Sequence, residues 1–345
     1  MQSPRRVALG AILGLAIGGL LTGVGALHQP GYAAGMPGKG VTVRPVQGTD
    51  LESRFQMEVV SIGLERLGYE VEEMKLMLGP PAYLAIAQGD LDFYAENWEP
   101  QHDAFIQAAG GDEKLTTLGV LISGAGQGYL IDKRTAEEFG ITNIEQLKDP
   151  EIAKLFDSDG DGKANLAGCP PGWGCELIIE HQMDAYGLRD TVTHDSGDWV
   201  PIHADAVARY RAGERILYYT YTPLWLNRLL VPGEDVEWLE VPEVAIPAKL
   251  MKEGVSTSLP DGRNVGWYVI NIRITANNDF LSKNPAAERF FDLVNIPLAD
   301  VDAQNYLIYK GEKSFPDVRR HAEEWVAKNE KQFSAWIEEA AKAAQ

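Results

Sequence analysis

Short apolar segments and segments with a helical period alternate along this chain from residue 41 onward. Short apolar or alternating runs predict strands, whereas apolar residues spaced three and four apart predict helices. The predicted strands are residues 41–46, 69–72, 91–94, 128–131, 216–219 and 268–274, and the predicted helices are residues 53–67, 80–88, 144–147, 152–156 and most of 285–345. This order of elements predicts an α/β architecture with a largely parallel sheet.

The first 35 residues have a different pattern, which predicts an export signal. Arg5 and Arg6 precede an uncharged apolar stretch, residues 7–27, and the small residues Ala33 and Ala34 suit cleavage. The apolar stretch is long enough nearly to span a bilayer, so an uncleaved N-terminal anchor is the alternative. Either interpretation places the rest of the chain in the periplasm or another extracytoplasmic compartment.

The composition allows a large hydrophobic core and limits the choice of partner. The chain has 345 residues, of which 45% are hydrophobic and 23% charged, so it can form one large domain or two of ordinary size. With 31 basic and 50 acidic residues, its formal net charge is −19, which would repel the phosphates of nucleic acid. We therefore exclude a nucleic-acid partner and regard a cationic ligand as compatible.

The segment 168–175, Gly-Cys-Pro-Pro-Gly-Trp-Gly-Cys, is the most specific motif of the chain. Cys169 and Cys175 are the only cysteines, and in an exported chain they are predicted to form a disulfide. Glycines on both sides of Trp173 allow the backbone to turn sharply and the indole to project. The apolar run that follows predicts a helix, so the N–H groups of Gly174 and Cys175 would lie at a helix N-terminus and suit a carboxylate. A purely structural loop with a packed tryptophan is the alternative.

Two further aromatic segments follow predicted strands. Trp98 comes just after the strand 91–94, and His102 is four residues on, so the two side chains would share a face if a helix began between them. Tyr221 stands in an aromatic run that follows the strand 216–219. Open α/β sheets bind ligands at the carboxyl ends of their strands, so both segments are candidates for a binding site. A lone tryptophan or histidine is nevertheless more often a packing residue.

An acidic loop offers a candidate metal site. Asp157, Asp159 and Asp161 have the spacing that opens an EF-hand calcium loop, and a glycine follows them. The twelfth position of such a loop, where a bidentate glutamate is expected, is Gly168. The segment is therefore either an incomplete structural calcium site or a simple turn rich in aspartate and glycine. No motif of the chain requires another cofactor.

The chain after the signal resembles a known family along its full length. The similarity is carried by Pro37-Gly38-Lys39-Gly40, Pro45-Val46-Gln47, Ala108-Ala109-Gly110-Gly111-Asp112, residues 126–133, Ile141-Thr142-Asn143-Ile144, Gln146-Leu147-Lys148-Asp149-Pro150, the cysteine segment 168–175 and Tyr218-Tyr219-Thr220. In these segments the chain is similar to the ProX-type glycine betaine/proline betaine substrate-binding proteins of osmoprotectant ABC transporters.

The resemblance implies a two-lobed periplasmic-binding-protein fold, type II-like, with a ligand cleft between the lobes. The first lobe would comprise residues 36–125 and 272–345, and the second lobe residues 126–271. Residues 1–35 would be the signal peptide or N-terminal anchor.

The resemblance also implies roles for individual residues. The ligand-binding residues that it carries over are Trp98, His102, Trp173, Gly174, Cys175 and Tyr221. The three aromatic residues would form a cage around a quaternary ammonium group by cation–π contact, and His102 with the two backbone amides would bind a carboxylate. Tyr221 stands where the family has a third tryptophan, and Trp225 is a lower-ranked candidate for that third ring.

Other residues near the proposed cleft have simpler interpretations. We expect Glu96, Glu99 and Asp103 to form its solvated rim, and long-range attraction for a cationic head group is the alternative. Trp199 and Trp267 have no assigned role, and packing in the core or on a lobe surface is the default for both.

The implied function is capture of glycine betaine, proline betaine or a related quaternary ammonium osmolyte, and its delivery to a membrane permease and its ATPase. A ligand-sensing module for choline-like or carnitine-like compounds in a membrane receptor system is the alternative. An enzyme is not expected, because oxidised cysteines are not nucleophiles and the chain has no G-x-S-x-G, H-E-x-x-H or phosphate-loop motif.

Overall fold

The computed structural model describes residues 36–259 and 261–345, so the predicted signal peptide or anchor at residues 1–35 lies outside the described residues. The strands are β1 (Thr42–Val43), β2 (Pro45–Gln47), β3 (Glu70–Val71), β4 (Lys75–Leu76), β5 (Phe93–Glu99), β6 (Leu115–Ala125), β7 (Gln127–Asp132), β8 (Ala164–Ala167), β9 (Val192–Asp195), β10 (Leu217–Tyr221), β11 (Val236–Trp238) and β12 (Ile270–Asn277). The α-helices are α1 (Arg54–Arg66), α2 (Gly79–Gln88), α3 (Asp103–Ala108), α4 (Lys133–Phe139), α5 (Pro150–Ala153), α6 (Gly174–Ala185), α7 (Trp199–Arg211), α8 (Asn278–Lys283), α9 (Pro285–Leu293), α10 (Leu298–Tyr309), α11 (Phe315–Lys328) and α12 (Glu330–Lys342). Short 3₁₀ helices are η1 (Gly111–Glu113), η2 (Ile144–Lys148), η3 (Lys154–Phe156), η4 (Trp225–Arg228) and η5 (Ala248–Leu250). Among these described helices, none combines the length and the apolar character needed to cross a membrane.

The described strands form two five-stranded sheets, with a separate small β1–β3 pair. The first sheet has the order β4-β2-β5-β12-β6 and the second has the order β11-β7-β10-β8-β9. In each sheet a parallel set, β4-β2-β5 or β10-β8-β9, adjoins antiparallel strands. The α/β class is confirmed, but the expectation of a largely parallel sheet is wrong, because both sheets are mixed. Hydrophobic period identifies a strand without reporting its direction.

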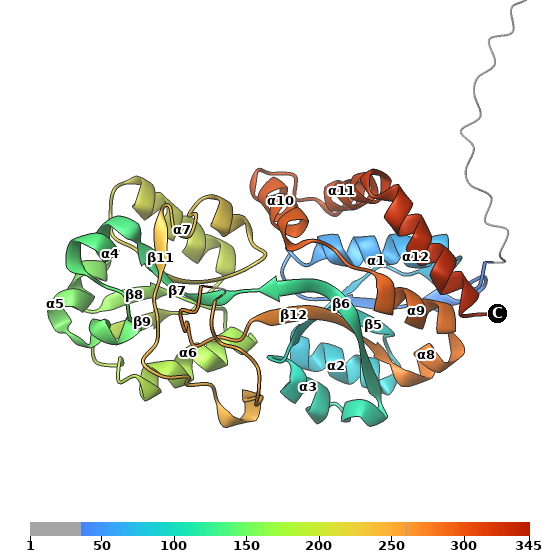
Figure 1. The fold of residues 1–345 in the computed structure, drawn as a ribbon, viewed down its shortest axis with the longest axis horizontal. Coiled ribbons are helices and arrows are strands. Elements are labelled where there is room, and N and C mark those ends of the chain that lie inside the picture. The colour runs from blue at the N-terminus through green and yellow to red at the C-terminus, as the bar shows by residue number, and fades with distance from the viewer. Residues whose placement is uncertain (1–35, 260) are drawn as a thin grey trace, which may run out of the picture. The chain divides into compact units, whose positions relative to one another are not determined.

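The chain crosses from one sheet to the other at two adjacent places. Strand β6 ends at Ala125 in the first sheet, and after Gly126 strand β7 begins in the second. The chain returns at β12, whose Ile270 pairs with Ala125. Figure 1 shows β6 leading into β7, with β12 running beside β6. The result is a two-lobed α/β fold in which each sheet carries its own helices.

The helices cover the sheets with apolar faces that the sequence pattern anticipates. Helix α1 fits the predicted helix 53–67 and buries its residues from Arg54 to Leu64, where Arg54 Nε donates to Glu58 Oε1 at 2.7 Å. Helices α1, α11 and α12 lie on one side of the first sheet, and α2 and α3 lie on the other (Figure 1). Helices α4 to α7 surround the second sheet.

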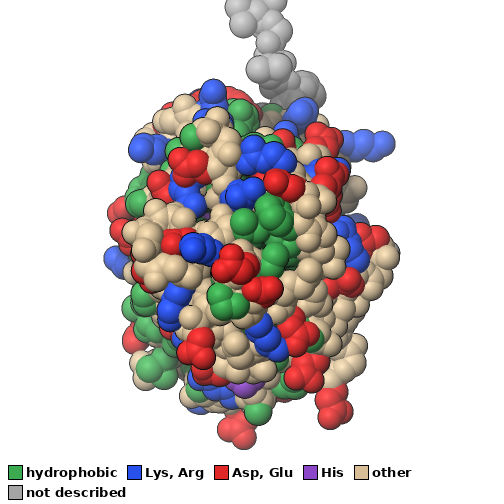
Figure 2. All heavy atoms as spheres, turned by 90° about the vertical axis from the view of Figure 1, so that its left-hand side faces the viewer, with side chains coloured by type: hydrophobic (Ala, Val, Ile, Leu, Met, Phe, Trp, Pro, Cys, Tyr) green, Lys and Arg blue, Asp and Glu red, His purple; other side chains and the backbone are tan. Residues whose placement is uncertain are grey.

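One end of the molecule, formed by the second sheet and its helices, has a mixed surface. Figure 2 shows acidic and basic side chains interspersed there, with hydrophobic side chains only in small groups. Charges of both signs that lie close together largely cancel at a distance. On this face, therefore, the net negative charge of the chain forms no single acidic patch for a cationic ligand.

Candidate ligand-binding site

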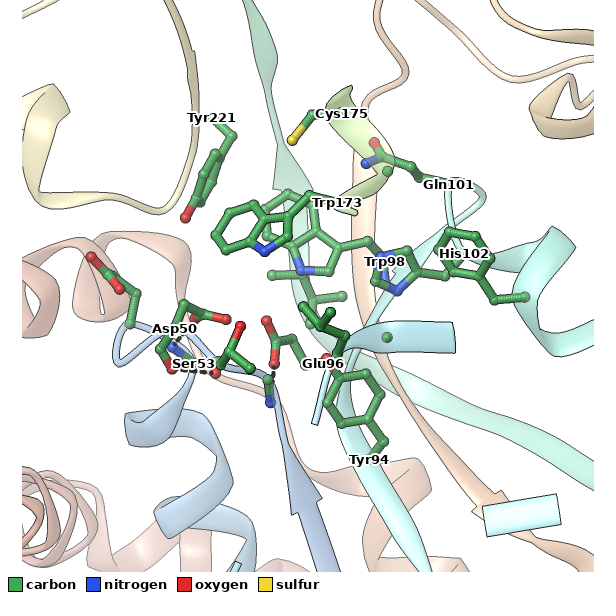
Figure 3. A pocket seen from close by; sticks show the side chains of 18 of the residues that line it. Asp50, Ser53, Tyr94, Glu96, Trp98, Gln101, His102, Trp173, Cys175 and Tyr221 are labelled. Carbon is green, nitrogen blue, oxygen red and sulfur yellow. Dashed lines mark hydrogen bonds between the residues drawn. The ribbon is translucent and has the colours of Figure 1, made fainter. Parts of the chain in front are cut away.

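A pocket between the two sheets brings together all the predicted binding residues. Trp98, His102, Trp173, Gly174, Cys175 and Tyr221 line it. Many of the other lining residues come from the loop between β2 and α1, the start of α2, strand β5, the β5–α3 turn and the end of β10. Figure 3 shows the Trp98, Trp173 and Tyr221 side chains converging on the pocket from different elements. The structure thus places the predicted binding residues around one pocket.

Trp98 lies at the C-terminal end of the central strand β5, and His102 lies in the turn that follows it. The strand continues to Glu99, five residues beyond the predicted end, so Trp98 lies within the strand and not after it. Helix α3 begins only after His102, which is its N-cap residue. The ring of His102 turns back to the strand, and the Trp98 backbone N–H donates to His102 Nδ1 at 3.4 Å. Trp98 and His102 are therefore brought together by the turn between β5 and α3, and not by a shared face of one helix.

His102 presents a neutral N–H donor. In the tautomer in which Nδ1 accepts from Trp98 N–H, the ring hydrogen lies on Nε2. Tyr83 Oη lies 2.9 Å from the same Nδ1 and donates to Asn97 Oδ1 at 3.0 Å, so it helps to fix the ring. Burial lowers the pKa of His102 to about 3, so the imidazole is uncharged near neutral pH. His102 can thus donate one hydrogen bond to a ligand carboxylate without adding a charge.

The disulfide segment contributes the Trp173 ring and two backbone N–H donors to the pocket. Cys169 and Cys175 are bonded, and helix α6 begins at Gly174, so the N–H groups of Gly174 and Cys175 lie in its first turn without intrahelical acceptors. A side chain at position 174 would meet the amide of Gln101 from the first lobe, because a Cβ there would lie 2.6 Å from Gln101 Nε2. Glycine at this position therefore allows the two lobes to approach closely.

A polar network holds the start of this segment. Cys169 N–H donates to His194 Nε2 at 3.1 Å, and Ser196 Oγ donates to the Cys169 carbonyl at 3.0 Å. His194 Nδ1 lies 2.7 Å from Glu180 Oε1 on α6. A Cβ at position 168 would lie 2.1 Å from the His194 ring, so only glycine fits there. The network connects the segment both to β9 and to its own helix.

The rings of the proposed cage already contact one another. Trp98 and Tyr221, from different lobes, meet edge to face with centroids 5.1 Å apart, and Trp173 lies 6.5 Å from Tyr221. A cation between these rings would replace ring–ring contacts by ring–methyl contacts, so the cage must widen to hold it. Trp225 is only 2% exposed, stacks on Tyr309 at 4.6 Å and is not among the lining residues. Tyr221 is therefore the better placed of the two candidates for the third ring.

One side of the pocket is acidic, and sequence reasoning missed most of it. Asp50 and Glu52 come from the loop after β2, and Glu96 comes from β5. Glu96 is 8% exposed and accepts from Gly48 N–H at 3.0 Å, so the expectation that it belongs to a solvated rim is wrong. Burial, together with the adjacent Asp50 carboxyl, raises the pKa of Glu96 well above its ordinary value. The sequence signal that could have identified this acidic side is the position of Asp50 and Glu52 shortly after the end of a strand.

Glu99 and Asp103 do form a rim. Lys252 Nζ lies 2.7 Å from Asp103 Oδ2 and 3.6 Å from Glu99 Oε1. Arg273 Nη1 lies 3.1 Å from Glu99 Oε2. Because these carboxylates are paired with basic side chains and partly exposed, they contribute little net charge to the pocket.

Glu52 predicts a dependence of ligand affinity on pH. Burial, and next the neighbouring Asp50, raise its pKa from 4.5 to about 7. A cationic ligand is attracted to ionised Glu52, so we expect the affinity for glycine betaine to rise about fivefold between pH 6 and pH 8, an effect of about 1 kcal/mol. Titration calorimetry across this range measures it, with Glu52→Gln as the matched variant. A profile equally steep in that variant would contradict the assignment.

The free energy of unfolding of the ligand-free protein should fall as pH rises, whereas the ligand affinity rises. An acid whose pKa is higher in the folded state stabilises the fold below its unfolded pKa and loses that contribution as pH rises through the folded pKa. For Glu52 this window runs from 4.5 to about 7 and corresponds to about 3 kcal/mol at most. Chemical unfolding at pH 5.5 and pH 8 should show a smaller decrease in Glu52→Gln than in the wild type.

The acidic loop has the geometry of a tight turn. Asp157 accepts backbone N–H groups from Gly160 at 2.7 Å and Gly162 at 2.9 Å. Asp157, Asp159 and Asp161 can each offer one carboxylate oxygen within 4.8 Å of the others. Both sequence interpretations, a calcium site and a plain turn, are compatible with this arrangement.

A two-lobed α/β fold with an aromatic pocket between the lobes is the architecture of the substrate-binding proteins that serve membrane transporters. The chain belongs to the family of substrate-binding domains of ABC-type glycine betaine transport systems, whose model matches residues 41–328. Its members bind substrates for transporters and are not enzymes.

Relatives with high identity cover nearly the whole chain. The glycine betaine-binding periplasmic protein OusX of Dickeya dadantii strain 3937 is 50% identical over 309 residues, which cover 90% of this chain and 92% of the relative. The glycine betaine/proline betaine-binding periplasmic protein of Escherichia coli K12 is 48% identical over 309 residues, covering 90% and 93%.

Solved structures with low identity share the fold. Lactococcal OpuAC, in a closed complex with glycine betaine, has a TM-score of 0.63 and 18% identity, with coverage of 86% of this chain and 99% of that one. An ABC-transporter choline-binding protein in complex with choline has a TM-score of 0.65 and 16% identity, with coverage of 88% and 96%. At these identities the likeness establishes architecture only.

Proposed function

We propose that this protein captures glycine betaine, or a closely related quaternary ammonium osmolyte, and delivers it to the permease and ATPase of an ABC importer. The observation that carries the proposal is one pocket with aromatic rings from both lobes and neutral donors beside them. Trp98 and His102 belong to the first lobe, whereas Trp173, Tyr221 and the α6 amides belong to the second. The curated relatives bear the names of glycine betaine-binding proteins, which supports the same ligand class.

The chemistry of glycine betaine matches both parts of this pocket. Its trimethylammonium group has no N–H and cannot donate a conventional hydrogen bond, but its diffuse charge and methyl groups suit the faces of aromatic rings. Its carboxylate suits the His102 N–H and the helix N-terminal amides of Gly174 and Cys175. Glu52, on another side of the pocket, adds attraction for the cation when it is ionised.

The expected affinity follows from these terms. Three desolvated rings contribute roughly 4–6 kcal/mol, and each hydrogen bond to the carboxylate contributes about 1.5–3 kcal/mol. Association itself costs several kcal/mol or more. A net value of about −8 kcal/mol, which corresponds to micromolar affinity, is therefore expected.

We further propose that the two sheets with their helices act as separate lobes, with boundaries near residues 125/126 and 271/272. The chain crosses between the sheets at Gly126 and Ile270. A ligand that touches rings and amides from both lobes favours the closed arrangement, because each lobe alone offers only part of the contacts.

The same proposal includes an extracytoplasmic location, after export directed by residues 1–35. The alternative, a sensing module for choline-like or carnitine-like compounds, has the same ligand chemistry. Co-purification separates the two: a transporter subunit prepared in membranes should retain the betaine-loaded protein, whereas a sensor should associate with a receptor instead.

The direct experiment is a thermal-shift panel followed by titration calorimetry. Glycine betaine, proline betaine, choline and carnitine should raise the melting temperature, while glycine and glutamate should not. No shift with any quaternary amine at millimolar concentration would refute the proposal.

We propose that capture requires no cofactor and that the acidic loop at Asp157 is a plain turn. The twelfth position, Gly168, supplies no carboxylate, so millimolar calcium should shift the melting temperature by less than about 1 °C. A rise of several degrees that Asp157→Asn abolishes would instead establish a structural calcium site.

A further inference from the structure

A fourth ring lies behind the proposed cage. Trp199, the first residue of α7, is 6% exposed and is not among the residues that line the pocket. Its indole lies 4.9 Å from the ring of Tyr221 and is stacked on Trp173 with centroids 6.0 Å apart and an interplanar angle of 14°. Trp199 thus contacts both of the second-lobe rings that line the pocket.

The two rings that it contacts come from separate segments. Trp173 belongs to the disulfide segment and Tyr221 to the end of β10, and Figure 3 shows both rings projecting into the pocket from the second lobe. Their mutual distance of 6.5 Å is longer than the distance from either ring to Trp199. The relative position of Trp173 and Tyr221 therefore depends on what fills the space behind them.

Trp199 is itself fixed by packing. The ring of His203 stacks on it with centroids 3.7 Å apart, and His203 Nε2 lies 2.8 Å from the Tyr219 carbonyl of β10. In contrast, the indole Nε1 of Trp199 is buried without a hydrogen-bond partner among the described residues. A buried donor without a partner costs stability, so the size of the indole, and not its N–H, accounts for its presence.

We propose that Trp199 is a positioning residue for the ligand site: it sets the spacing of Trp173 and Tyr221 and fills the volume that lets a tyrosine serve as the third ring. This inference rests on the proposed function and deepens it. Cage rings stabilise a cation only at a suitable distance and orientation, and a cavity behind them would let them relax into it. Conversely, a larger ring at position 221 would collide with Trp199, because that space is already filled.

The test is an exchange of volume between the two positions. Trp199→Tyr and Tyr221→Trp should each weaken glycine betaine binding by about fivefold or more, the first by loosening the rings and the second by overpacking. The double variant restores the summed volume, so its Kd should return to within about threefold of the wild type. Calorimetry at a temperature where circular dichroism shows every variant folded gives the three values, with Trp199→Phe as a further variant if Trp199→Tyr is unstable.

Trp267→Tyr is the matched control. Trp267 is also buried and also has an unpartnered Nε1, and its ring contacts Tyr219 and Tyr129 but neither Trp173 nor Tyr221. The Trp267→Tyr substitution should lower the melting temperature and leave the Kd for glycine betaine unchanged. Combined with Tyr221→Trp, it should not restore the affinity.

Two ligands separate an effect on the rings from an effect on the carboxylate donors. Because Trp199 supports the rings and not the carboxylate donors, its substitution should raise the Kd values of choline and glycine betaine by the same factor. An unchanged Kd in Trp199→Tyr, or additive losses in the double variant, overturns the inference while wild-type binding leaves the proposed function intact. A wild-type protein that binds no quaternary amine overturns both.

Discussion

Trp173→Ala is expected to weaken glycine betaine binding by about tenfold or more without unfolding the protein, since it removes one desolvated ring from the cage. The indole is partly exposed, it is attached to a segment fixed by the Cys169–Cys175 bond, and helix α6 begins directly after it. Its removal therefore deprives the ligand of a contact and leaves the scaffold in place. Titration calorimetry gives the affinity, and thermal unfolding reports stability separately.

Trp336→Ala is the control for this prediction. Trp336 is another partly exposed tryptophan, but it lies on α12 and contacts Phe333 away from the pocket. Choline should lose affinity in Trp173→Ala as glycine betaine does, because both ligands carry the same head group. Unchanged affinity for both ligands would remove Trp173 from the cage.

His102→Ala should weaken glycine betaine binding by roughly ten- to a hundredfold, the loss of one hydrogen bond to a charged group. The imidazole is held by Tyr83 Oη and Trp98 N–H, so its Nε2–H is oriented before the ligand arrives. Because burial lowers the pKa of His102 to about 3, this contribution should not change between pH 5 and pH 8.

Choline distinguishes the role of His102 from a general loss of structure. Choline has no carboxylate, so His102→Ala should leave its affinity within about twofold of the wild type, less than 0.5 kcal/mol. An equal loss for choline and glycine betaine would mean that the substitution disturbs Trp98 and the cage instead of removing a carboxylate donor.

The sequence pattern was sufficient for the α/β class, and the family resemblance pointed to the aromatic and donor residues that meet in the pocket. Helical period located α1, and the glycines around Trp173 together with the apolar run after Cys175 located the start of α6. Local signals of this kind depend on neighbours in the chain, so they can be read without knowing the tertiary structure.

The features that the sequence did not reveal depend on contacts between distant segments. The direction of β12 depends on where the chain returns from the second sheet, and the burial of Glu96 depends on the loop that carries Asp50. The contacts of Trp199 join α7, the disulfide segment and β10, which have no common sequence pattern. Two of the wrong expectations, a largely parallel sheet and a solvated Glu96, concern such long-range relations, whereas the predicted strand 91–94 was wrong in its end.

The central claim is that aromatic faces bind a methylated cation through its charge as well as its shape. The most direct measurement compares glycine betaine with tert-butylacetate, in which a carbon atom replaces the nitrogen and the head keeps its shape without its charge. The cage predicts that tert-butylacetate binds at least about a hundredfold more weakly, since the cation–π contribution of three rings is lost. Equal affinity of the two ligands for the wild-type protein would contradict it.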